Sequence, residues 1–263
     1  MMDLLVIFSA VLMAFVLAAI ISWKGGLPKK VVLFWGIVIG IAAGLIVNLV
    51  IPQAHFIVVV IAEFIAIILL GVLMIALRFY RDPERIPPEA KRVILAPADG
   101  KIKYIKTFEK NSIPASEKNH HSIPLDEFSG TDFIKNNGQI VGIGMSILDV
   151  HVNRAPIAGK IILSKHISGI FLSLKNPDAL LRNERATLVI DSGEFRIGIV
   201  LIASRLVRKI VIYKQEGDQL TIGERLGMIK FGSQTDVIMP ESVTITVKPG
   251  EQVYAGQTII GKY

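Results

Sequence analysis

The chain has 263 residues, 52% of them hydrophobic, and its 29 Lys and Arg outnumber 22 Asp and Glu to give a net charge of +7. Because cysteine is absent, disulfides, thiolate catalysis and cysteine-based metal sites are excluded. A basic chain can bind nucleic acid, but there is no basic stripe with interleaved aromatic residues. We therefore expect no nucleic-acid partner and favour an anionic membrane surface.

Three apolar stretches open the chain, at residues 4–23, 31–51 and 56–77. Each has about 20 residues, roughly 30 Å as a helix, which matches the hydrocarbon core of a bilayer. None shows the polar face of a helix that packs on a soluble core. The first also lacks the basic start and the small-residue cleavage site of a signal peptide. Residues 1–78 are therefore predicted to form a transmembrane anchor of three helices.

Basic residues predict the orientation of this anchor. They are Lys24, Lys29 and Lys30 after the first stretch, and Arg78, Arg81 and Arg85 after the third. The loop between the second and third stretches, residues 52–55, has neither Lys nor Arg. Because basic loops stay in the cytoplasm, we expect a three-pass protein of the cell membrane whose C-terminal domain is cytoplasmic.

Glu63 lies inside the third apolar stretch, where a carboxylate is energetically unfavourable and often functional. One interpretation is that it packs inside the helix bundle, neutral or paired with a polar group such as Asn48. The other is a role in lipid handling. We favour the first, because it needs no further assumption about the substrate.

Residues 79–92 have the composition of a linker, and their prolines end a helix. From residue 93 to 263 the pattern changes to short runs of β-branched residues separated by Gly, Pro, Asn and Asp. The expected strands lie near residues 93–96, 100–105, 140–145, 160–163, 186–191, 195–203 and 208–213, with one helical turn at 178–182. The predicted fold class is a membrane-anchored α+β protein, with three N-terminal transmembrane helices followed by a mostly antiparallel, β-barrel-like domain.

Two further segments are distinctive. Residues 111–137 are polar and irregular, and we expect a surface loop or flap. Its adjacent His120 and His121 have no partner at a clear ligand spacing, so we expect no metal site. Residues 247–261 are predicted to form a strand, a Pro-Gly turn and a second strand, similar to the turn at residues 96–102.

Three short motifs contain carboxylate, imidazole and hydroxyl side chains that could act in catalysis. They are Ala96-Pro-Ala-Asp99-Gly100, the run from Met145 to Gly159 with Asp149, His151, Asn153 and Arg154, and Phe231-Gly232-Ser233. Each motif alone is ordinary, because an aspartate before glycine or a Gly-Ser pair is usually a turn. Together with Arg182-Asn-Glu-Arg185, in this order and spacing, they resemble the phosphatidylserine decarboxylases, a pyruvoyl-dependent family. The resemblance runs from about residue 81 to the C-terminus, and the shorter Phe-Gly-Ser form, which includes archaetidylserine decarboxylase, is the more similar.

The resemblance implies self-cleavage between Gly232 and Ser233, giving a β chain of residues 1–232 and an α chain of residues 233–263. Ser233 would become a pyruvoyl group, so no external cofactor is expected. This ketone would form a Schiff base with the amine of a membrane serine phospholipid, phosphatidylserine or archaetidylserine, and release CO2 and the ethanolamine lipid. The catalytic residues implied are Ser233, His151 and Asp99: a base accepts the hydroxyl proton, and a carboxylate orients the base.

Arg154 marks a departure from the family pattern. Longer members have a second histidine three positions after the first, and here that position holds Arg154. Arginine cannot act as the general base, because it stays protonated. One possibility is that His151 serves in both self-cleavage and decarboxylation. The other is that Arg154 orients a carboxylate or the lipid phosphate, with Asn153 as a second substrate-binding candidate.

Two other functions remain open at this point. The chain could be a non-enzymatic, membrane-anchored β module that binds a lipid or a protein, with Gly232-Ser233 as a plain turn. It could also be a tethered serine hydrolase that uses Ser233, His151 and Asp99. The sequence leaves open whether the lipid tails are esters or ethers, whether the chain is precursor or mature, and whether it forms a homodimer.

Overall fold

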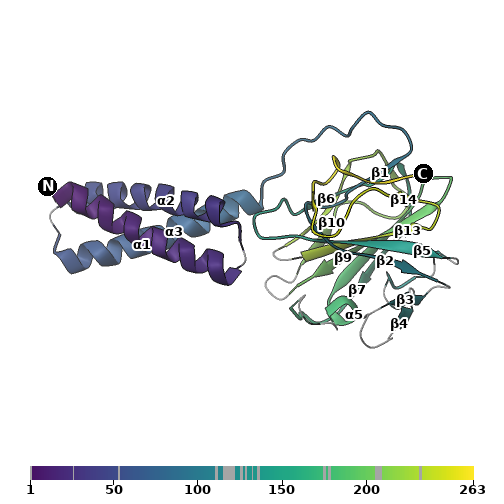
Figure 1. The fold of residues 1–263 in the computed structure, drawn as a ribbon, viewed down its shortest axis with the longest axis horizontal. Coiled ribbons are helices and arrows are strands. Elements are labelled where there is room, and N and C mark those ends of the chain that lie inside the picture. The colour runs from purple at the N-terminus through teal and green to yellow at the C-terminus, as the bar shows by residue number, and fades with distance from the viewer. Residues whose placement is uncertain are drawn as a thin grey trace. The chain divides into compact units, whose positions relative to one another are not determined.

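The computed structural model describes residues 2–25, 27–52, 54–109, 112–114, 122–124, 127, 129–131, 133–134, 137–173, 176, 179–204, 209–230 and 233–263. The chain forms two compact units, Met1–Arg78 and Phe79–Tyr263 (Figure 1). Most of the predicted polar loop at 111–137, including His120 and His121, falls outside the described residues, and so does Gly232.

The first unit consists of three helices, as predicted: α1 (Met2–Gly25), α2 (Lys29–Val50) and α3 (Phe56–Phe79). All three are long and apolar enough to cross a membrane. Their outward side chains are apolar: Leu4, Leu49 and Phe56 are 75%, 83% and 73% exposed. Contiguous apolar surface of this kind is unfavourable in water and stable in hydrocarbon.

Small residues bring α1 and α2 into close contact. Gly36, Gly40 and Gly44 lie one turn apart on α2 and are buried. A Cβ atom on Gly40 would lie 2.6 Å from the Cα of Val11, and one on Gly44 would lie 2.8 Å from the Cα of Ile7. Only glycine allows the two backbones to approach this closely, which is the small-residue packing typical of membrane helices.

A carboxylate links α3 to α1. Glu63 is completely buried, and the Ser9 hydroxyl lies 2.8 and 3.0 Å from its two oxygens. Glu63 therefore packs inside the helix bundle, as we favoured, but its polar partner is Ser9 and not Asn48.

The second unit is built on one eight-stranded antiparallel sheet, in the order β11-β7-β8-β9-β13-β5-β2-β15. Its strands are β2 (Gly100–Phe108), β5 (Gly138–Gly144), β7 (Gly159–Ile167), β8 (Arg185–Asp191), β9 (Arg196–Ala203), β11 (Gln219–Leu220), β13 (Ser233–Pro240) and β15 (Gln252–Val253). The sheet curls into a half-barrel (Figure 1). The predicted antiparallel β architecture is thus confirmed as an open, curled sheet.

Smaller elements complete this unit. One three-stranded sheet contains β1 (Val93–Leu95), β16 (Ile259–Lys262) and β14 (Thr244–Ile245), and another contains β10 (Ile210–Ile212), β12 (Arg225–Ile229) and β6 (Val152–Arg154). A short pair, β3 (Ser112–Pro114) and β4 (Ser122–Pro124), and one helical turn, α5 (Ala179–Arg182), make up the rest of the described elements.

The central strands of the large sheet are covered on both faces. On β9, Ile197, Ile199 and Leu201 belong to the main core, whereas Val200 and Ile202 belong to a second core on the other face. Because successive side chains of a strand point to opposite faces, burial on both sides explains the continuous apolar run in the sequence.

The C-terminal segment differs from the predicted strand–turn–strand. The strands that flank the Pro249-Gly250 turn are β14 and β15, and they do not pair with each other: β15 pairs with β2, and β14 pairs with β16, which also pairs with β1. The reason is that the start of the domain crosses this segment. The Ala96 N–H donates to the Thr258 carbonyl at 2.8 Å, and the Gly256 N–H donates to the Ala96 carbonyl at 2.8 Å.

Candidate active site

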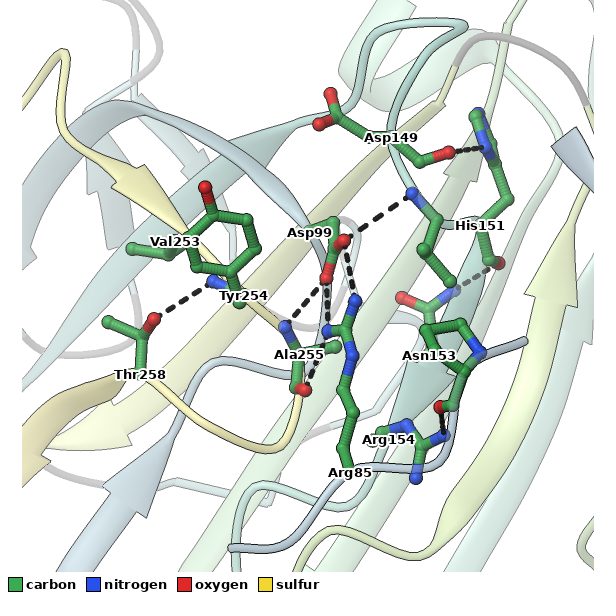
Figure 2. A network of polar contacts seen from close by, with 12 residues as sticks. Arg85, Asp99, Asp149, His151, Asn153, Arg154, Val253, Tyr254, Ala255 and Thr258 are labelled. Carbon is green, nitrogen blue, oxygen red and sulfur yellow. Dashed lines mark hydrogen bonds and ion pairs between the residues drawn. The ribbon is translucent and has the colours of Figure 1, made fainter. Parts of the chain in front are cut away.

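His151 lies just before β6, and its ring is completely buried. Its Nδ1 is 2.9 Å from the Asp149 carbonyl oxygen (Figure 2). A carbonyl can only accept, so Nδ1 carries the proton in the neutral ring and Nε2 keeps a lone pair. Nε2 is buried and has no hydrogen-bond partner among the described residues. The imidazole is therefore arranged as a base.

Its surroundings keep this imidazole neutral. Burial lowers the pKa of His151, and the positive charge of Arg81 lowers it further. These effects exceed those of the hydrogen bond to the Asp149 carbonyl and of the negative charges of Asp149 and Asp99, which raise the pKa. The ring of Phe79 covers the imidazole, with 4.2 Å between the ring centroids. A neutral imidazole at pH 7 is able to accept a proton.

Asp99 occupies the turn between β1 and β2 and is 2% exposed. Its Oδ1 accepts from Arg85 Nη1 at 2.5 Å and from the Ala255 N–H at 2.8 Å. Its Oδ2 accepts from Arg85 Nη2 at 2.8 Å and from the Val150 N–H at 3.4 Å (Figure 2). Both carboxylate oxygens thus have two donors each.

Glycine is required immediately after Asp99. Gly100 has a φ of +145°, which L side chains rarely adopt. A Cβ atom there would also lie 2.4 Å from the carbonyl oxygen of Gly144 on β5. The turn that presents Asp99 is therefore tied to the first pairing of β2 with β5.

Among the described side chains, no hydrogen bond joins Asp99 to His151. The link between them is the main chain of Val150, which donates to Asp99 and directly precedes His151. The group that orients the imidazole is the carbonyl of Asp149, a residue to which the sequence motif gave no role. The negative charge of Asp99 favours the protonated imidazole, and so it opposes the larger effect of burial on the pKa of His151.

The backbone of Ser233 begins β13, where it pairs with Ala203 of β9. On one side of the predicted cleavage bond, the Ile229 N–H lies 3.3 Å from the His151 carbonyl. On the other side, the Thr235 hydroxyl donates to Asn153 Oδ1 at 2.8 Å. In the sequence these two contacts flank the predicted cleavage bond, and both are made to residues 151–153, at the start of β6.

The two substrate-binding candidates, Asn153 and Arg154, form hydrogen bonds within the protein. Asn153 is completely buried, and besides accepting from Thr235 it donates to the His151 carbonyl at 3.3 Å. Arg154 is 3% exposed and donates to Asp82 at 3.0 Å, to the Pro83 carbonyl at 2.9 Å and to the Gly223 carbonyl at 3.1 Å. For Arg154, the geometry favours orientation of a carboxylate over binding of a lipid phosphate.

Comparison with known proteins identifies the family of this fold and site. A family model described as phosphatidylserine decarboxylase matches residues 73–261. The chain belongs to the phosphatidylserine decarboxylase family. The chain is thus a decarboxylase, and the interpretation as a non-enzymatic β module is wrong.

Relatives of this decarboxylase are named as proenzymes. The chain is 43% identical over 198 residues to the "Putative archaetidylserine decarboxylase proenzyme" of Methanocaldococcus jannaschii, covering 75% of this chain and 94% of the relative. It is 36% identical over 193 residues to the phosphatidylserine decarboxylase proenzyme of Chlorobium chlorochromatii, covering 73% of this chain and 80% of the relative. The two names differ in the lipid, and both describe a precursor.

Sequence reasoning missed several groups at the site of this decarboxylase. Arg85 entered only as a positive charge that orients the helices, although it is the main side-chain partner of Asp99. Asp82, the partner of Arg154, was part of the linker. The one available signal was the cluster of two acidic and two basic residues within Arg81-Asp82-Pro-Glu84-Arg85. The N–H of Ala255 carries no side-chain signature at all.

Proposed function

We propose that this decarboxylase matures by cutting its own chain and then converts a serine phospholipid, phosphatidylserine or archaetidylserine, to the ethanolamine lipid and CO2. One observation carries the proposal: a buried, neutral His151 has an Nε2 with no partner among the described residues, and its carbonyl accepts from Ile229, just before Gly232 in the sequence. The precursor names of the relatives support it.

The cleavage step uses His151 as the base. Nε2 takes the hydroxyl proton of Ser233, and the oxygen attacks the carbonyl carbon of Gly232. The peptide C–N bond breaks, which leaves an ester and a free amino group on Ser233. Loss of the Ser233 α-proton then breaks the ester C–O bond and releases the Gly232 carboxylate. Water hydrolyses the remaining enamine, with loss of ammonia, and leaves a ketone at the new N-terminus.

The residues around the start of β13 fit a pyruvoyl group. When formed, such a group would supply an electrophilic carbonyl for the substrate amine and an acceptor for the electrons that remain when CO2 leaves. β13 would hold it, since the strand is paired on both sides, with β9 and β5. The buried hydrogen bond between Thr235 and Asn153 fixes the register. His151 would return a proton to the substrate carbon, and the charge of Asp99 would favour its protonated form during that transfer.

The α chain would stay bound after cleavage. Residues 233–263 contribute β13, β14, β15 and β16. Strand β13 lies between β9 and β5, β15 pairs with β2 and β16 pairs with β1. Because all of these partners come from residues before the cut, we expect the two chains to remain one folded unit.

The apolar helices would deliver the enzyme to its substrate. We infer that α1, α2 and α3 span the membrane, with the basic loop and the catalytic unit on the cytoplasmic side. Their length and apolar composition support this inference. A membrane-bound decarboxylase meets its lipid substrate without extracting it into water.

The experiment follows Ser233→Ala beside the wild type in detergent or lipid nanodiscs. The wild type should give two fragments on a denaturing gel and release CO2 from a serine phospholipid, whereas S233A should remain one inactive chain. Parallel assays with diacyl and diether substrates will assign the lipid class. Decarboxylation by an uncut wild type would refute the proposal, and phosphonate trapping of an uncut Ser233 would instead support a serine hydrolase.

A further inference from the structure

Residues 79–87, which we call the strap, are bound to the predicted catalytic residues. The Phe79 ring packs against His151, and Arg85 forms an ion pair with Asp99. Arg154 pairs with Asp82 and donates to the Pro83 carbonyl. Two further contacts join Arg81 to the Leu148 carbonyl, at 2.9 Å, and Asp82 to Arg225. Each of His151, Arg154 and Asp99 therefore has a strap residue against it.

The contact between Arg85 and Asp99 is the most enclosed of these. The two side chains are 7% and 3% exposed. The guanidinium donates one hydrogen bond to each carboxylate oxygen, at 2.5 and 2.8 Å, and a further one to the Ala255 carbonyl at 2.8 Å (Figure 2). A two-pronged contact of this kind fixes the plane of a carboxylate, because both partners are planar.

We propose that Arg85 is the positioning residue of Asp99, and that the strap thereby completes the processing site. The inference rests on the proposed function, since it concerns the rate of self-cleavage. Without Arg85, the described contacts of Asp99 reduce to the N–H groups of Ala255 and Val150. The second of these is long, at 3.4 Å, so rotation of the carboxylate would break it.

Rotation of the Asp99 carboxylate would affect His151 in two ways. The Val150 N–H holds the main chain directly before His151, so its release would let the imidazole leave the position that the proposed cleavage requires. Rotation would also change the distance between the Asp99 carboxylate and the His151 ring, and so the extent to which this charge favours protonated His151. A displacement of about 1 Å in a reacting group can slow a reaction by roughly 100-fold.

Ion pairs in and near the strap that do not contact Asp99 provide control positions for substitution. Arg225 pairs with Glu84, which is 82% exposed, and Arg92, just beyond the strap, pairs with Glu194, with side chains 61% and 56% exposed. Exposed ion pairs of this kind contribute little to stability. Arg92 therefore serves as a matched arginine near the strap whose loss should leave cleavage unchanged.

The test measures the rate of precursor cleavage in the full chain after cell-free synthesis into nanodiscs, together with the melting temperature. Arg85→Gln should slow cleavage by on the order of 100-fold. Arg85→Lys keeps the charge without the planar fork and should recover part of the rate. Arg92→Gln should cleave at the wild-type rate. The inference is overturned if R85Q cleaves like the wild type, or if R85K is slowed as much as R85Q.

A further variant covers a loss of folding. If the Arg85 variants melt at lower temperature, Arg85→Ala is synthesised with millimolar guanidinium, which can occupy the vacated position. Recovery of cleavage supports positioning, because guanidinium does not otherwise stabilise a fold, and absence of recovery overturns it. A wild type that never cleaves would refute the proposed function itself, so the two failures are distinguishable.

Discussion

At the scale of single residues, the main chain sets the state of the proposed base. The carbonyl of Asp149 holds the Nδ1 proton of His151, and burial keeps the ring neutral. The proposed base thus needs no carboxylate in direct contact. The carboxylate Asp99 is held instead by Arg85 and two main-chain N–H groups.

Self-cleavage should accordingly depend on the protonation of His151. Because its pKa is lowered, the cleavage rate should fall only in acid, with half its maximum below the ordinary histidine pKa of about 6.5. His151→Gln should abolish cleavage. The matched control is His166→Gln, since His166 is half exposed and pairs with Glu184 at 3.3 Å. Time courses of cleavage between about pH 5 and pH 8 check this, and a half-maximum above 6.5 would contradict it.

A second buried carboxylate should affect stability. Asp236 is completely buried, accepts from Tyr104 at 2.5 Å and from Gln234 at 2.7 Å, and burial raises its pKa to about 6. An unfolded aspartate has a pKa of about 3.9, so between these values the folded state binds more protons and the free energy of unfolding falls as pH rises. Asp236→Asn should remove this fall. Denaturant titrations at about pH 4 and pH 6.5 measure it, and an unchanged pH dependence would contradict it.

At the scale of elements, glycines decide two close approaches. In the first unit, Gly40 lets α2 contact the backbone of α1. In the second, Gly100 lets the Asp99 turn meet β5. Both positions can be tested against glycines of the same elements or turn types that have open space around them.

Gly40→Leu should separate α1 from α2, since its Cβ atom would lie 2.6 Å from the Cα of Val11. The control is Gly71→Leu on α3, where a Cβ atom meets nothing within 4 Å among the described residues. We expect a clear loss of melting temperature in detergent for the first variant and little change for the second. Equal effects would mean that the close packing of α1 and α2 is not what stabilises the bundle.

Gly100→Ala combines backbone strain with a clash, because the new Cβ atom would lie 2.4 Å from the Gly144 carbonyl oxygen. Gly193→Ala, at a φ of +88° and with open space around it, carries the strain alone. The strain costs about 1–2 kcal/mol, and the clash should raise the loss for Gly100→Ala beyond it. Chemical unfolding of both variants compares the two costs, and equal losses would show that the clash is relieved.

At the scale of the whole molecule, the sequence predicted the parts better than their connections. The apolar helices and the antiparallel strands follow from residue type and periodicity, whereas Asp99, His151 and Ser233 were singled out by the resemblance to the family. Arg85 followed from neither, because its partner Asp99 lies 14 residues away along the chain, beyond strand β1. Ala255 lies 156 residues from Asp99 and contributes only an N–H, which every residue except proline possesses.

The pairing of β14 and β15 was missed for the same reason. A Pro-Gly turn between apolar runs predicts a local hairpin, but β14 pairs with β16, and β15 pairs with β2 near the start of the domain. This long-range pairing also explains how a cut before Ser233 can leave the fold intact. The strands on either side of the cut are held by neighbours that do not depend on the broken peptide bond.

The most direct test of the account is the intact mass of the wild-type protein after it has been allowed to mature. We predict a small C-terminal fragment, residues 233–263, whose first residue has lost its amino group and carries a ketone that reacts with hydroxylamine. A single uncut chain, or a fragment that begins with an ordinary serine, would contradict self-processing at this site.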